Sequence, residues 1–349
     1  MVGKSSGGEV PRPGFGRAMV ALQEHESVVR PMPASSGSSA WPNSPETPTS
    51  AERVVEPSVS TWLLQETGVP ILREVVARCD AAAIPVLPVK GIVTSRWLYG
   101  DVAQRPITDV DVRVRAQDFR RFQHLAARAG WRCLRVALSY RNLVYDFGAL
   151  SLDVEASIGP PGLCGLDIVM MMERSVRHEI APGLRVSVPE IHDHAVLLVI
   201  NAFKDKIVTA APSSIADLER IVVQPGFRLG TFVERAEHAR VATIVWLVAA
   251  YLESARGSGT WGAIRVAVES TGRVRRLYAR LIQHELAAAE RAPMFLRLLA
   301  RVGADSRAMQ VEALVRAVAW TMEMGVRGDS GGGDATGRRG AQGSARGGG

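Results

Sequence analysis

The chain contains little lysine and little cysteine, and the shortage of cysteine limits the kinds of cross-link and metal site that it can form. Only four of its 42 basic residues are lysine, so arginine supplies the other 38. The three cysteines, Cys79, Cys133 and Cys164, are far apart and form no Cys-x-x-Cys pair. This pattern excludes a disulfide framework and a zinc site built from cysteine pairs, and it predicts free thiols in a reducing compartment.

The chain also lacks a hydrophobic run long enough to span a membrane. The longest run, VATIVWLVAAYL at 241–252, falls short of the roughly 18–20 apolar residues that a spanning helix needs. We therefore expect it to form a buried helix. The first residues, MVGKSSGGEVPRPG, lack the apolar segment of a secretory signal. These absences predict a cytoplasmic protein without a membrane partner.

The 349 residues do carry a net charge of +7 and a hydrophobic content of 47%. This length suffices for a sizeable core, in one large domain or two modest ones. A basic balance suits anionic ligands such as nucleotides and also permits nucleic-acid binding, so charge alone does not choose between them. Because lysine is kept at so few positions, Lys90 stands out within the motif-bearing segment described below.

Composition and periodicity divide the chain into four parts. Residues 1–57, rich in Ser, Pro, Gly and Glu, and the Gly-rich tail 327–349 are expected to be disordered, because neither can bury enough apolar surface. Residues 58–186 alternate between helical and strand-like periods, whereas 187–326 is almost entirely helical in period. The sequence thus predicts a mixed helix-and-strand domain followed by a helical one.

Within these parts, periodicity predicts the individual elements. The expected helices of the first domain cover residues 58–83, 92–100 and 117–130. Its expected strands cover residues 84–89, 108–114, 131–138, 142–147 and 150–157. The expected helices of the second domain cover residues 189–207, 213–223, 228–255, 273–292 and 309–324. Gly130 stands at the end of the third helix, where a glycine is favoured as the residue after the cap.

The segment TDVDVRVR places two carboxylates on one face of a strand. Alternation puts Asp109 and Asp111 opposite the valines, and Arg113 shares their face. The two aspartate Cα atoms lie roughly 6.5–7 Å apart in a strand, so their carboxylates can converge on hard cations such as Mg²⁺. A pair of such ions can hold the attacking and leaving oxygens of a phosphoryl displacement.

A third carboxylate from a neighbouring strand is normally needed to complete such a site. In LSLDVEAS, Asp153 and Glu155 share the face opposite the apolar residues. We expect Asp153 to be the third ligand, with Glu155 as its nearest competitor. An Asp-x-Asp pair followed by arginines is, however, also typical of a solvated, salt-bridged strand face.

Two neighbouring features favour the metal site over the solvated face. A short apolar strand ends in Lys90-Gly91 and opens a helix, and a helix N-terminus that begins with glycine offers phosphate a binding place. Arg105 lies just before the strand of Asp109, where its guanidinium could reach a phosphate.

The segment PVKGIVTSRWLYGDVAQRPITDVDVRVRAQDFRRFQHLAARAGW resembles the core of the uncharacterised nucleotidyltransferase family of the DNA polymerase β-like superfamily. That family's pattern is an apolar strand, Lys-Gly, a helix ending in Tyr, Arg-Pro-x-x-Asp-x-Asp, and a helix ending in Gly-Tyr or Gly-Trp. The residues that match it are Lys90, Gly91, Tyr99, Arg105, Pro106, Asp109, Asp111, Gly130 and Trp131. The similarity extends more weakly to LSLDVEAS and to the helical segments as far as residue 224.

The resemblance implies an α+β fold, with a polymerase β-like core of a small mixed sheet and flanking helices followed by an all-helical domain. It implies that Asp109 and Asp111 bind Mg²⁺, with Mn²⁺ as an alternative, and that Asp153 is the third ligand or the base for an acceptor hydroxyl. Lys90 and Gly91 would stand where such enzymes hold the triphosphate of an NTP, for which ATP is the expected nucleotide.

The chain departs from the family's pattern within the expected site. Arg113 stands where the family has an apolar residue, and there it could pair with the aspartates or bind a nucleotide phosphate. Glu155 and Asn201 stand where family members tend to carry histidine, although Lys204 remains.

These features predict an enzyme that moves an NMP from an NTP to an acceptor hydroxyl or phosphate and releases pyrophosphate. The acceptor could be a small molecule, a protein or an RNA end. The alternative is a catalytically inactive module of the same fold that binds a nucleotide, RNA or a protein partner. Catalysis and metal binding are assigned to Asp109, Asp111 and Asp153, and nucleotide binding to Lys90, Gly91, Arg105 and Arg113.

Other conspicuous residues receive structural interpretations. His192 and His194 lie two positions apart on a predicted helix, where side chains do not face each other, so we do not assign them a metal. Asp217 is expected to be a buried polar partner at the domain junction or, as an alternative, a capping or ion-pair residue. The residues expected in the core include Trp131, Tyr140 and Tyr145.

Overall fold

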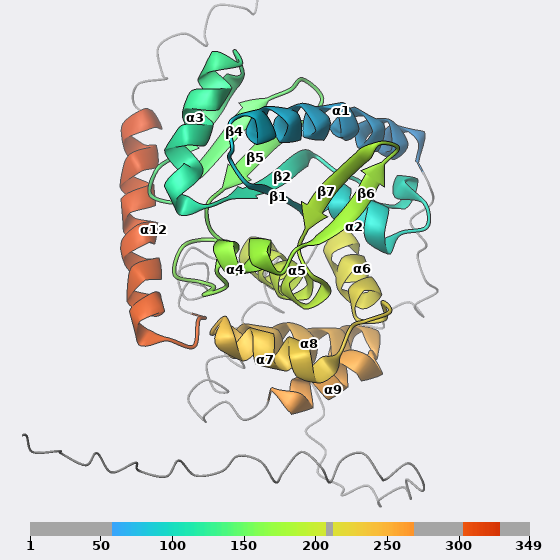
Figure 1. Cartoon of the computed structure of the whole chain (residues 1–349). Coiled ribbons are helices and arrows are strands. Elements are labelled where there is room, and N and C mark those ends of the chain that lie inside the picture. Colours follow the sequence, from blue (N-terminus) through green and yellow to red (C-terminus); the bar gives the residue numbers. More distant parts are fainter. Residues whose placement is uncertain (1–57, 207–211, 269–302, 329–349) are drawn as a thin grey trace, which may run out of the picture. The chain divides into compact units, whose positions relative to one another are not determined.

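The computed structural model describes residues 58–206, 212–268 and 303–328 (Figure 1). The N-terminal segment predicted to be disordered, the helix predicted over 273–292 and the tail beyond 328 lie outside these residues. Within them, a mixed sheet with flanking helices comes first, and only helices follow from α5 (Ile191–Lys206) onward. The predicted α+β fold class is confirmed.

A five-stranded sheet forms the frame of the first part. Its strands are β1 (Val86–Val89), β2 (Asp109–Val114), β3 (Arg132–Ala137), β4 (Asn142–Asp146) and β5 (Ser151–Glu155). They lie in the order β1-β2-β5-β4-β3. β2 and β5 pair in parallel, whereas the other neighbours pair antiparallel, so the sheet is mixed. β1 and β3 therefore occupy opposite edges, and the acidic strands β2 and β5 lie between them.

One face of this sheet packs against helices. The helices are α1 (Val59–Ala81), α2 (Gly91–Leu98) and α3 (Phe119–Arg128), and Figure 1 shows α1 running across the sheet. The three valines of β2 are fully buried and share an apolar cluster with Leu72 of α1 and Phe122 of α3. Gly130 follows the end of α3 with φ of 73°, a conformation that favours glycine, as predicted.

Several short elements were not predicted. They are α4 (Ile168–Glu173), the hairpin of β6 (Val176–Ala181) and β7 (Leu184–Val188), and α9 (Gly259–Ala267). Most residues of β6 are exposed or half-buried, so its sequence lacks the clean alternation of a strand with one buried face. β7 packs beside β1 without joining its sheet.

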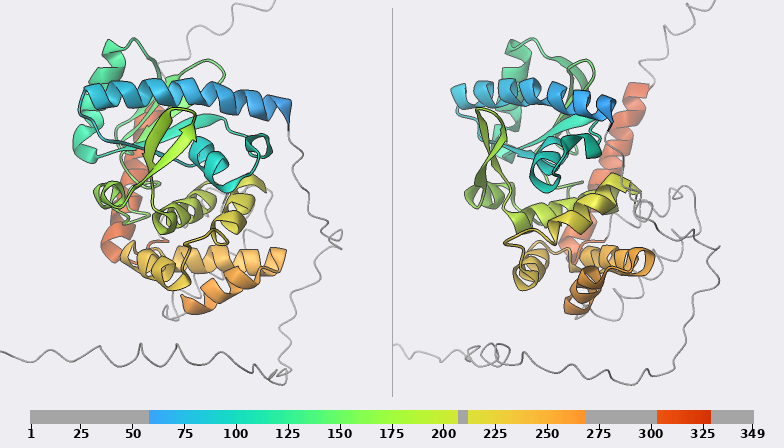
Figure 2. Two further views of the ribbon diagram at one scale, coloured as in Figure 1. Left: turned by 45° about the vertical axis from the view of Figure 1, so that its right-hand side comes forward. Right: turned by 90° about the vertical axis from the view of Figure 1, so that its right-hand side faces the viewer.

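Helices make up the second part of the described chain. They are α5, α6 (Pro212–Ile221), α7 (Leu229–His238), α8 (Ala242–Arg256), α9 and α12 (Arg307–Gly328). Both views of Figure 2 show α5 and α6 between the sheet and the group of α7, α8 and α9. α12 runs two residues into the segment predicted as a tail.

The single helix predicted over 228–255 is wrong, because the chain breaks between α7 and α8. Arg240 adopts a left-handed φ of 58° there, and its carbonyl accepts a hydrogen bond from the backbone N–H of Asp305 at 2.7 Å. The apolar residues of α8 are largely buried, which confirms the interpretation of 241–252 as a buried helix. None of the helices described in this structure is both long and apolar enough to cross a membrane.

The His192-Asp193-His194 segment of α5 has three separate environments. His192 Nδ1 pairs with Glu190 at 2.5 Å, and Asp193 is bound by arginines. His194 is fully buried, and its Nε2 lies 3.1 Å from the hydroxyl of Thr94 on α2. Burial, aided by the charge of Arg105, lowers the pKa of His194 to about 3. The two histidines therefore serve different contacts.

We predict that His194 makes the fold less stable as pH falls. The unfolded chain protonates this ring near pH 6.5, about 3.5 units above the pKa of the folded protein, so the free energy of unfolding decreases as pH falls from 6.5 towards 3. The loss is at most about 1.4 kcal/mol per pH unit. In His194→Gln, whose amide can retain the contact to Thr94, this loss disappears. Urea denaturation at several pH values measures the difference.

The control is His238→Gln, at an exposed position on α7. It should keep the pH dependence of the wild type. An equal pH dependence in His194→Gln and in the wild type would contradict the assignment.

Candidate active site

Two neighbouring parallel strands place their acidic residues side by side. In the register of β2 and β5, Asp111 lies across from Asp153, and Arg113 lies across from Glu155. Asp109 precedes Asp111 on the same face of β2, because successive side chains of a strand point to opposite faces. The valines of β2 fill the core behind this face, so the acidic residues turn away from α1 and α3.

Asp109, Asp111 and Asp153 form a group of the size that suits a cation. One carboxylate oxygen from each residue lies within 4.8 Å of the others. Oxygen ligands of this kind are preferred by hard divalent cations. Asp111 is 3% exposed and the other two are half-buried, so water screens their charges only in part. The structure thus brings together the three carboxylates selected from the sequence, and their donor set fits a divalent cation.

The electrostatics of the group reflect its crowded negative charge. Burial raises the pKa of Asp109 to about 6, and the charge of Asp111 adds to the rise. Burial also raises the pKa of Asp153 to about 7, with contributions from Glu155 and Asp111. Carboxylates behave in this way when nearby positive charge does not fully balance them.

Lys90 reaches the group from the end of β1. Its Nζ donates a hydrogen bond to Asp111 Oδ1 at 2.8 Å, and the side chain is buried. Lys90 has φ of 50°, an unusual conformation for a residue with a Cβ, which costs about 1–3 kcal/mol. Gly91 follows at the start of α2, where a Cβ would lie 3.3 Å from the backbone oxygen of Asp109. This turn brings the helix N-terminus close to β2.

Arg113 and Glu155 form a buried ion pair beside the group. Arg113 Nη2 lies 2.6 Å from Glu155 Oε2, and Arg113 Nη1 lies 3.9 Å from Asp111 Oδ1. From α5, Lys204 Nζ lies 3.8 Å from Glu155 Oε1. Although burial raises it, the charges of Arg113, Lys204 and Lys90 lower the pKa of Glu155 to about 2. Glu155, the competitor for the third ligand, is therefore engaged by cations.

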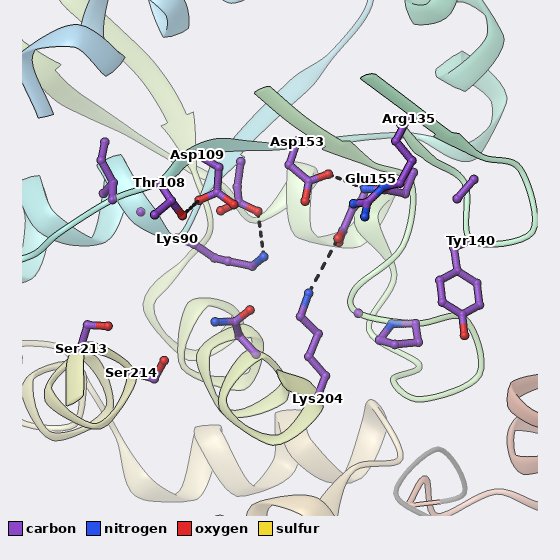
Figure 3. A pocket seen from close by; sticks show the side chains of 18 of the residues that line it. Lys90, Thr108, Asp109, Arg135, Tyr140, Asp153, Glu155, Lys204, Ser213 and Ser214 are labelled. Atoms are coloured by element: carbon purple, nitrogen blue, oxygen red, sulfur yellow. Dashed lines mark hydrogen bonds and ion pairs between the residues drawn. The ribbon is translucent and has the colours of Figure 1, made fainter. Parts of the chain in front are cut away.

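A pocket of about 460 Å³ opens over these side chains (Figure 3). The site residues predicted from the sequence that line it are Lys90, Gly91, Arg105, Asp109, Asp111 and Asp153. Arg113 was also predicted, but it is 1% exposed and lies outside the lining. The lining residues that were not predicted include Arg135, Tyr140, Asn142, Ser213, Ser214 and Trp320.

The expectation that Tyr140 lies in the core is wrong, because this residue lines the pocket and is only half-buried. It lies in the turn between β3 and β4, one residue before Arg141, which has φ of 49°. Its position between two predicted strands could have indicated a turn residue. Tyr145, which lies inside β4, is 2% exposed and belongs to the core as expected.

The family of uncharacterised nucleotidyltransferases has a model that matches residues 66–257, more than half of the chain. The chain belongs to this family. The matched residues contain all five strands of the sheet and the carboxylates Asp109, Asp111 and Asp153. α12, which brings Trp320 to the pocket, lies beyond the matched residues. No curated protein matches the chain.

Solved structures of the antibiotic-resistance factor ANT(2″)-Ia are similar to this chain. Its solution structure is 15% identical, covers 63% of this chain and 97% of that one, and gives a TM-score of 0.36. Its crystal structure in complex with adenylyl-2″-tobramycin is 16% identical, with a coverage of 49% and 97% and a TM-score of 0.37.

Arg105 is held by a carboxylate from the helical part of the described chain. Its Nε and Nη2 donate to the two oxygens of Asp217 on α6, at 2.8 and 2.6 Å. The hydroxyl of Tyr99 donates to the same carboxylate at 2.8 Å, and all three side chains are buried. Asp217 is therefore an ion-pair partner, one of the roles expected for it. The cluster fastens the loop before β2 to α6.

We predict that Asp217→Ala destabilises the fold by about 3–5 kcal/mol, because it leaves the Arg105 guanidinium buried without its counter-charge. Urea denaturation followed by circular dichroism measures the loss. The matched control is Glu219→Ala on the same helix. Glu219 is partly exposed in a pair with Arg256, so its removal should cost less than about 1 kcal/mol. Equal losses in the two variants would show that the buried cluster does not anchor α6.

Proposed function

We propose that this protein moves a nucleoside monophosphate from an NTP to an acceptor hydroxyl or phosphate, with release of pyrophosphate. The observation that carries the proposal is the convergence of Asp109, Asp111 and Asp153 in a pocket whose other walls carry cationic and hydrogen-bonding side chains. Phosphoryl transfer needs this combination, because catalysis consists largely of positioning phosphates and balancing their charge.

The three carboxylates would hold Mg²⁺, with Mn²⁺ as the alternative ion. When bound there, such ions neutralise phosphate oxygens and stabilise charge on the attacking and leaving oxygens. The carboxylates themselves fix where this positive charge lies relative to the substrate. Asn142 supports this arrangement, because its side-chain amide donates to Asp153.

The nucleotide phosphates would lie beside Lys90 and Gly91, at the N-terminus of α2. The lysine supplies positive charge, and the close turn lets the helix terminus approach the ligand. Arg105 adds a fixed charge behind this turn, and its Nη1 donates to the Gly91 carbonyl at 3.3 Å. Arg113 would act on the nucleotide only indirectly, as a counter-charge to Asp111 and Glu155.

The transfer forms one bond and breaks one. The acceptor oxygen bonds to the α-phosphorus, the bond from that phosphorus to the β-bridging oxygen breaks, and its electron pair leaves with pyrophosphate. The proton of an acceptor hydroxyl passes to a base. Asp153, if it is not a metal ligand, is the carboxylate for that role, because it lies on the pocket wall beside the acidic pair.

The second candidate function is a catalytically inactive module that binds a nucleotide, RNA or a protein. The observation that favours it is the occupation of Asp111 by side-chain cations, Lys90 Nζ at 2.8 Å and Arg113 Nη1 at 3.9 Å. In such a module these cations would replace the metal. Nucleotide binding would then persist without a divalent cation.

Transfer activity decides between the two candidates. We expect the wild-type protein, incubated with each α-labelled NTP, Mg²⁺ and a cell extract, to label an acceptor. Asp109→Asn and Asp111→Asn should each reduce the labelling rate by about 100-fold or more, because changes even beside metal ligands cost 10–100-fold. The matched control is Asp146→Asn on β4, which lies outside the pocket and pairs with Arg132. Undiminished labelling by the aspartate variants would refute the proposal.

Metal binding can be tested separately by thermal unfolding. Mg²⁺ or Mn²⁺ at 100 times its Kd should stabilise the wild type by about 2.7 kcal/mol. Asp109→Asn should lose this response, and without metal it should be at least as stable as the wild type, because it removes repulsion from the group. The control is Glu179→Gln on the exposed hairpin, which should respond to metal as the wild type does. If Asp109→Asn is stabilised by the metal as much as the wild type, the metal binds elsewhere.

A further inference from the structure

One end of the pocket is built from an aromatic pair and an arginine. Tyr140, in the turn between β3 and β4, stacks on Trp320 of α12 with ring centroids 5.6 Å apart and an interplanar angle of 12°. Both rings are half-buried, and Arg135 of β3 lines the pocket beside them. The charge of Arg135 also acts on Glu155 and contributes to the lowering of its pKa. We call these three residues the aromatic end.

α12 is fastened to the turn that carries Tyr140. Glu323 accepts hydrogen bonds from the backbone N–H of Leu138 at 3.0 Å and from the hydroxyl of Ser139 at 2.8 Å. Arg316 Nη1 donates to the Ser139 carbonyl at 3.3 Å. The wall is therefore a specific structure, since several α12 side chains fix the turn and the helix to each other.

A second contact holds the same helix against the loop that follows β5. A Cβ on Gly162 would lie 2.5 Å from the backbone nitrogen of Ala313, so α12 approaches this loop more closely than any other residue would allow. Gly162 also has φ of 82°, which itself favours glycine. Gly159 and Pro160 of this loop line the pocket. α12 is thus an integral part of the pocket wall.

The order of the strands puts the aromatic end opposite the turn of Lys90 and Gly91. Lys90 follows β1 at one edge of the sheet, whereas Arg135 lies on β3 at the other edge, and the acidic strands β2 and β5 run between them. Figure 3 shows the same order, with Lys90 on one side of Asp153 and Tyr140 on the other.

The geometry of in-line displacement indicates which end of the pocket holds the donor and which holds the acceptor. The attacking and leaving oxygens lie on opposite sides of the phosphorus that is transferred. If the triphosphate lies against Lys90, as in the proposed function, the pyrophosphate leaves towards that edge. The acceptor oxygen must then arrive from the opposite edge, where the aromatic end lies.

We propose that the aromatic end formed by Arg135, Tyr140 and Trp320 binds the acceptor, and that the acceptor is a small nucleotide-like molecule with a planar ring, an anionic group and a hydroxyl. This assignment rests on the proposed function. A planar ring fits because the faces of aromatic side chains stack on bases, whatever the base. An anionic group fits because Arg135 offers a charged fork for it, whereas a polycationic acceptor would be repelled there.

The probes are the four nucleoside 5′-monophosphates, which contain all three chemical features. Their binding is measured by calorimetry with Mg²⁺ and a saturating, non-transferable α,β-methylene NTP, so that the donor position is filled. We expect one monophosphate to bind the wild type, and we expect Trp320→Leu and Arg135→Gln each to weaken that binding at least about tenfold, the equivalent of 1.4 kcal/mol. The affinity for the NTP analogue should change less than about twofold.

Controls separate loss of the site from loss of the fold. Met322→Ala lies on the outer, exposed face of α12 and should leave both affinities unchanged. Thermal unfolding shows whether each variant is folded, and Tyr140→Phe should retain monophosphate binding, because the stacking ring is kept.

Three results would overturn the assignment. If the variants weaken the NTP analogue as much as the monophosphate, the aromatic end holds the donor base. If none of the monophosphates binds the wild type while the analogue does, the acceptor is of another class. If an RNA oligonucleotide binds far more tightly than its 3′-terminal monophosphate, with steep salt dependence, the acceptor is not a small molecule. Failure of the analogue itself to bind in the presence of Mg²⁺ would instead count against the proposed function.

Discussion

Four carboxylates project from β2 and β5 towards one pocket, and their mutual repulsion is the constraint on which the rest of the site depends. Glu155 is balanced by Arg113 and Lys204, and its pKa falls to about 2. Burial raises the pKa values of Asp109 and Asp153 to about 6 and about 7, and the charges of neighbouring carboxylates add to the rise. The parallel register thus sets Glu155, which Arg113 and Lys204 engage, apart from the three aspartates, whose oxygens lie close enough together to hold a cation and of which Asp111 also pairs with Lys90.

The scaffold around this group holds conformations that would be unfavourable alone. Lys90 keeps its left-handed φ because it is buried and bonded to Asp111, and strain of this kind persists only where the surroundings fix it. Arg105 stabilises the neighbouring turn through the Gly91 carbonyl while Asp217 anchors it to α6. A pocket built from both parts of the chain therefore depends on buried ion pairs, which are costly to break but do not by themselves make a protein stable.

Much of this arrangement follows from local sequence pattern. Alternation places Asp109, Asp111 and Asp153 on single strand faces, so the carboxylate group was predictable once the strands were. Alternation does not set the register between strands, so the pairing of Arg113 with Glu155 could not be predicted from the sequence. Contacts between residues far apart in the sequence could not be predicted from local pattern either. Asp217, the partner of Arg105, lies 112 positions further along the chain, and tertiary packing brings the two together.

The central claim is that the three aspartates bind a divalent cation beside the nucleotide. The most direct test is a crystal structure with Mn²⁺ and a non-transferable NTP, in which the anomalous signal locates the manganese. We expect a manganese peak within about 2.0–2.3 Å of carboxylate oxygens from Asp109, Asp111 and Asp153, with the triphosphate reaching towards Lys90. Nucleotide bound without any manganese at these carboxylates, and Lys90 still paired with Asp111, would contradict it.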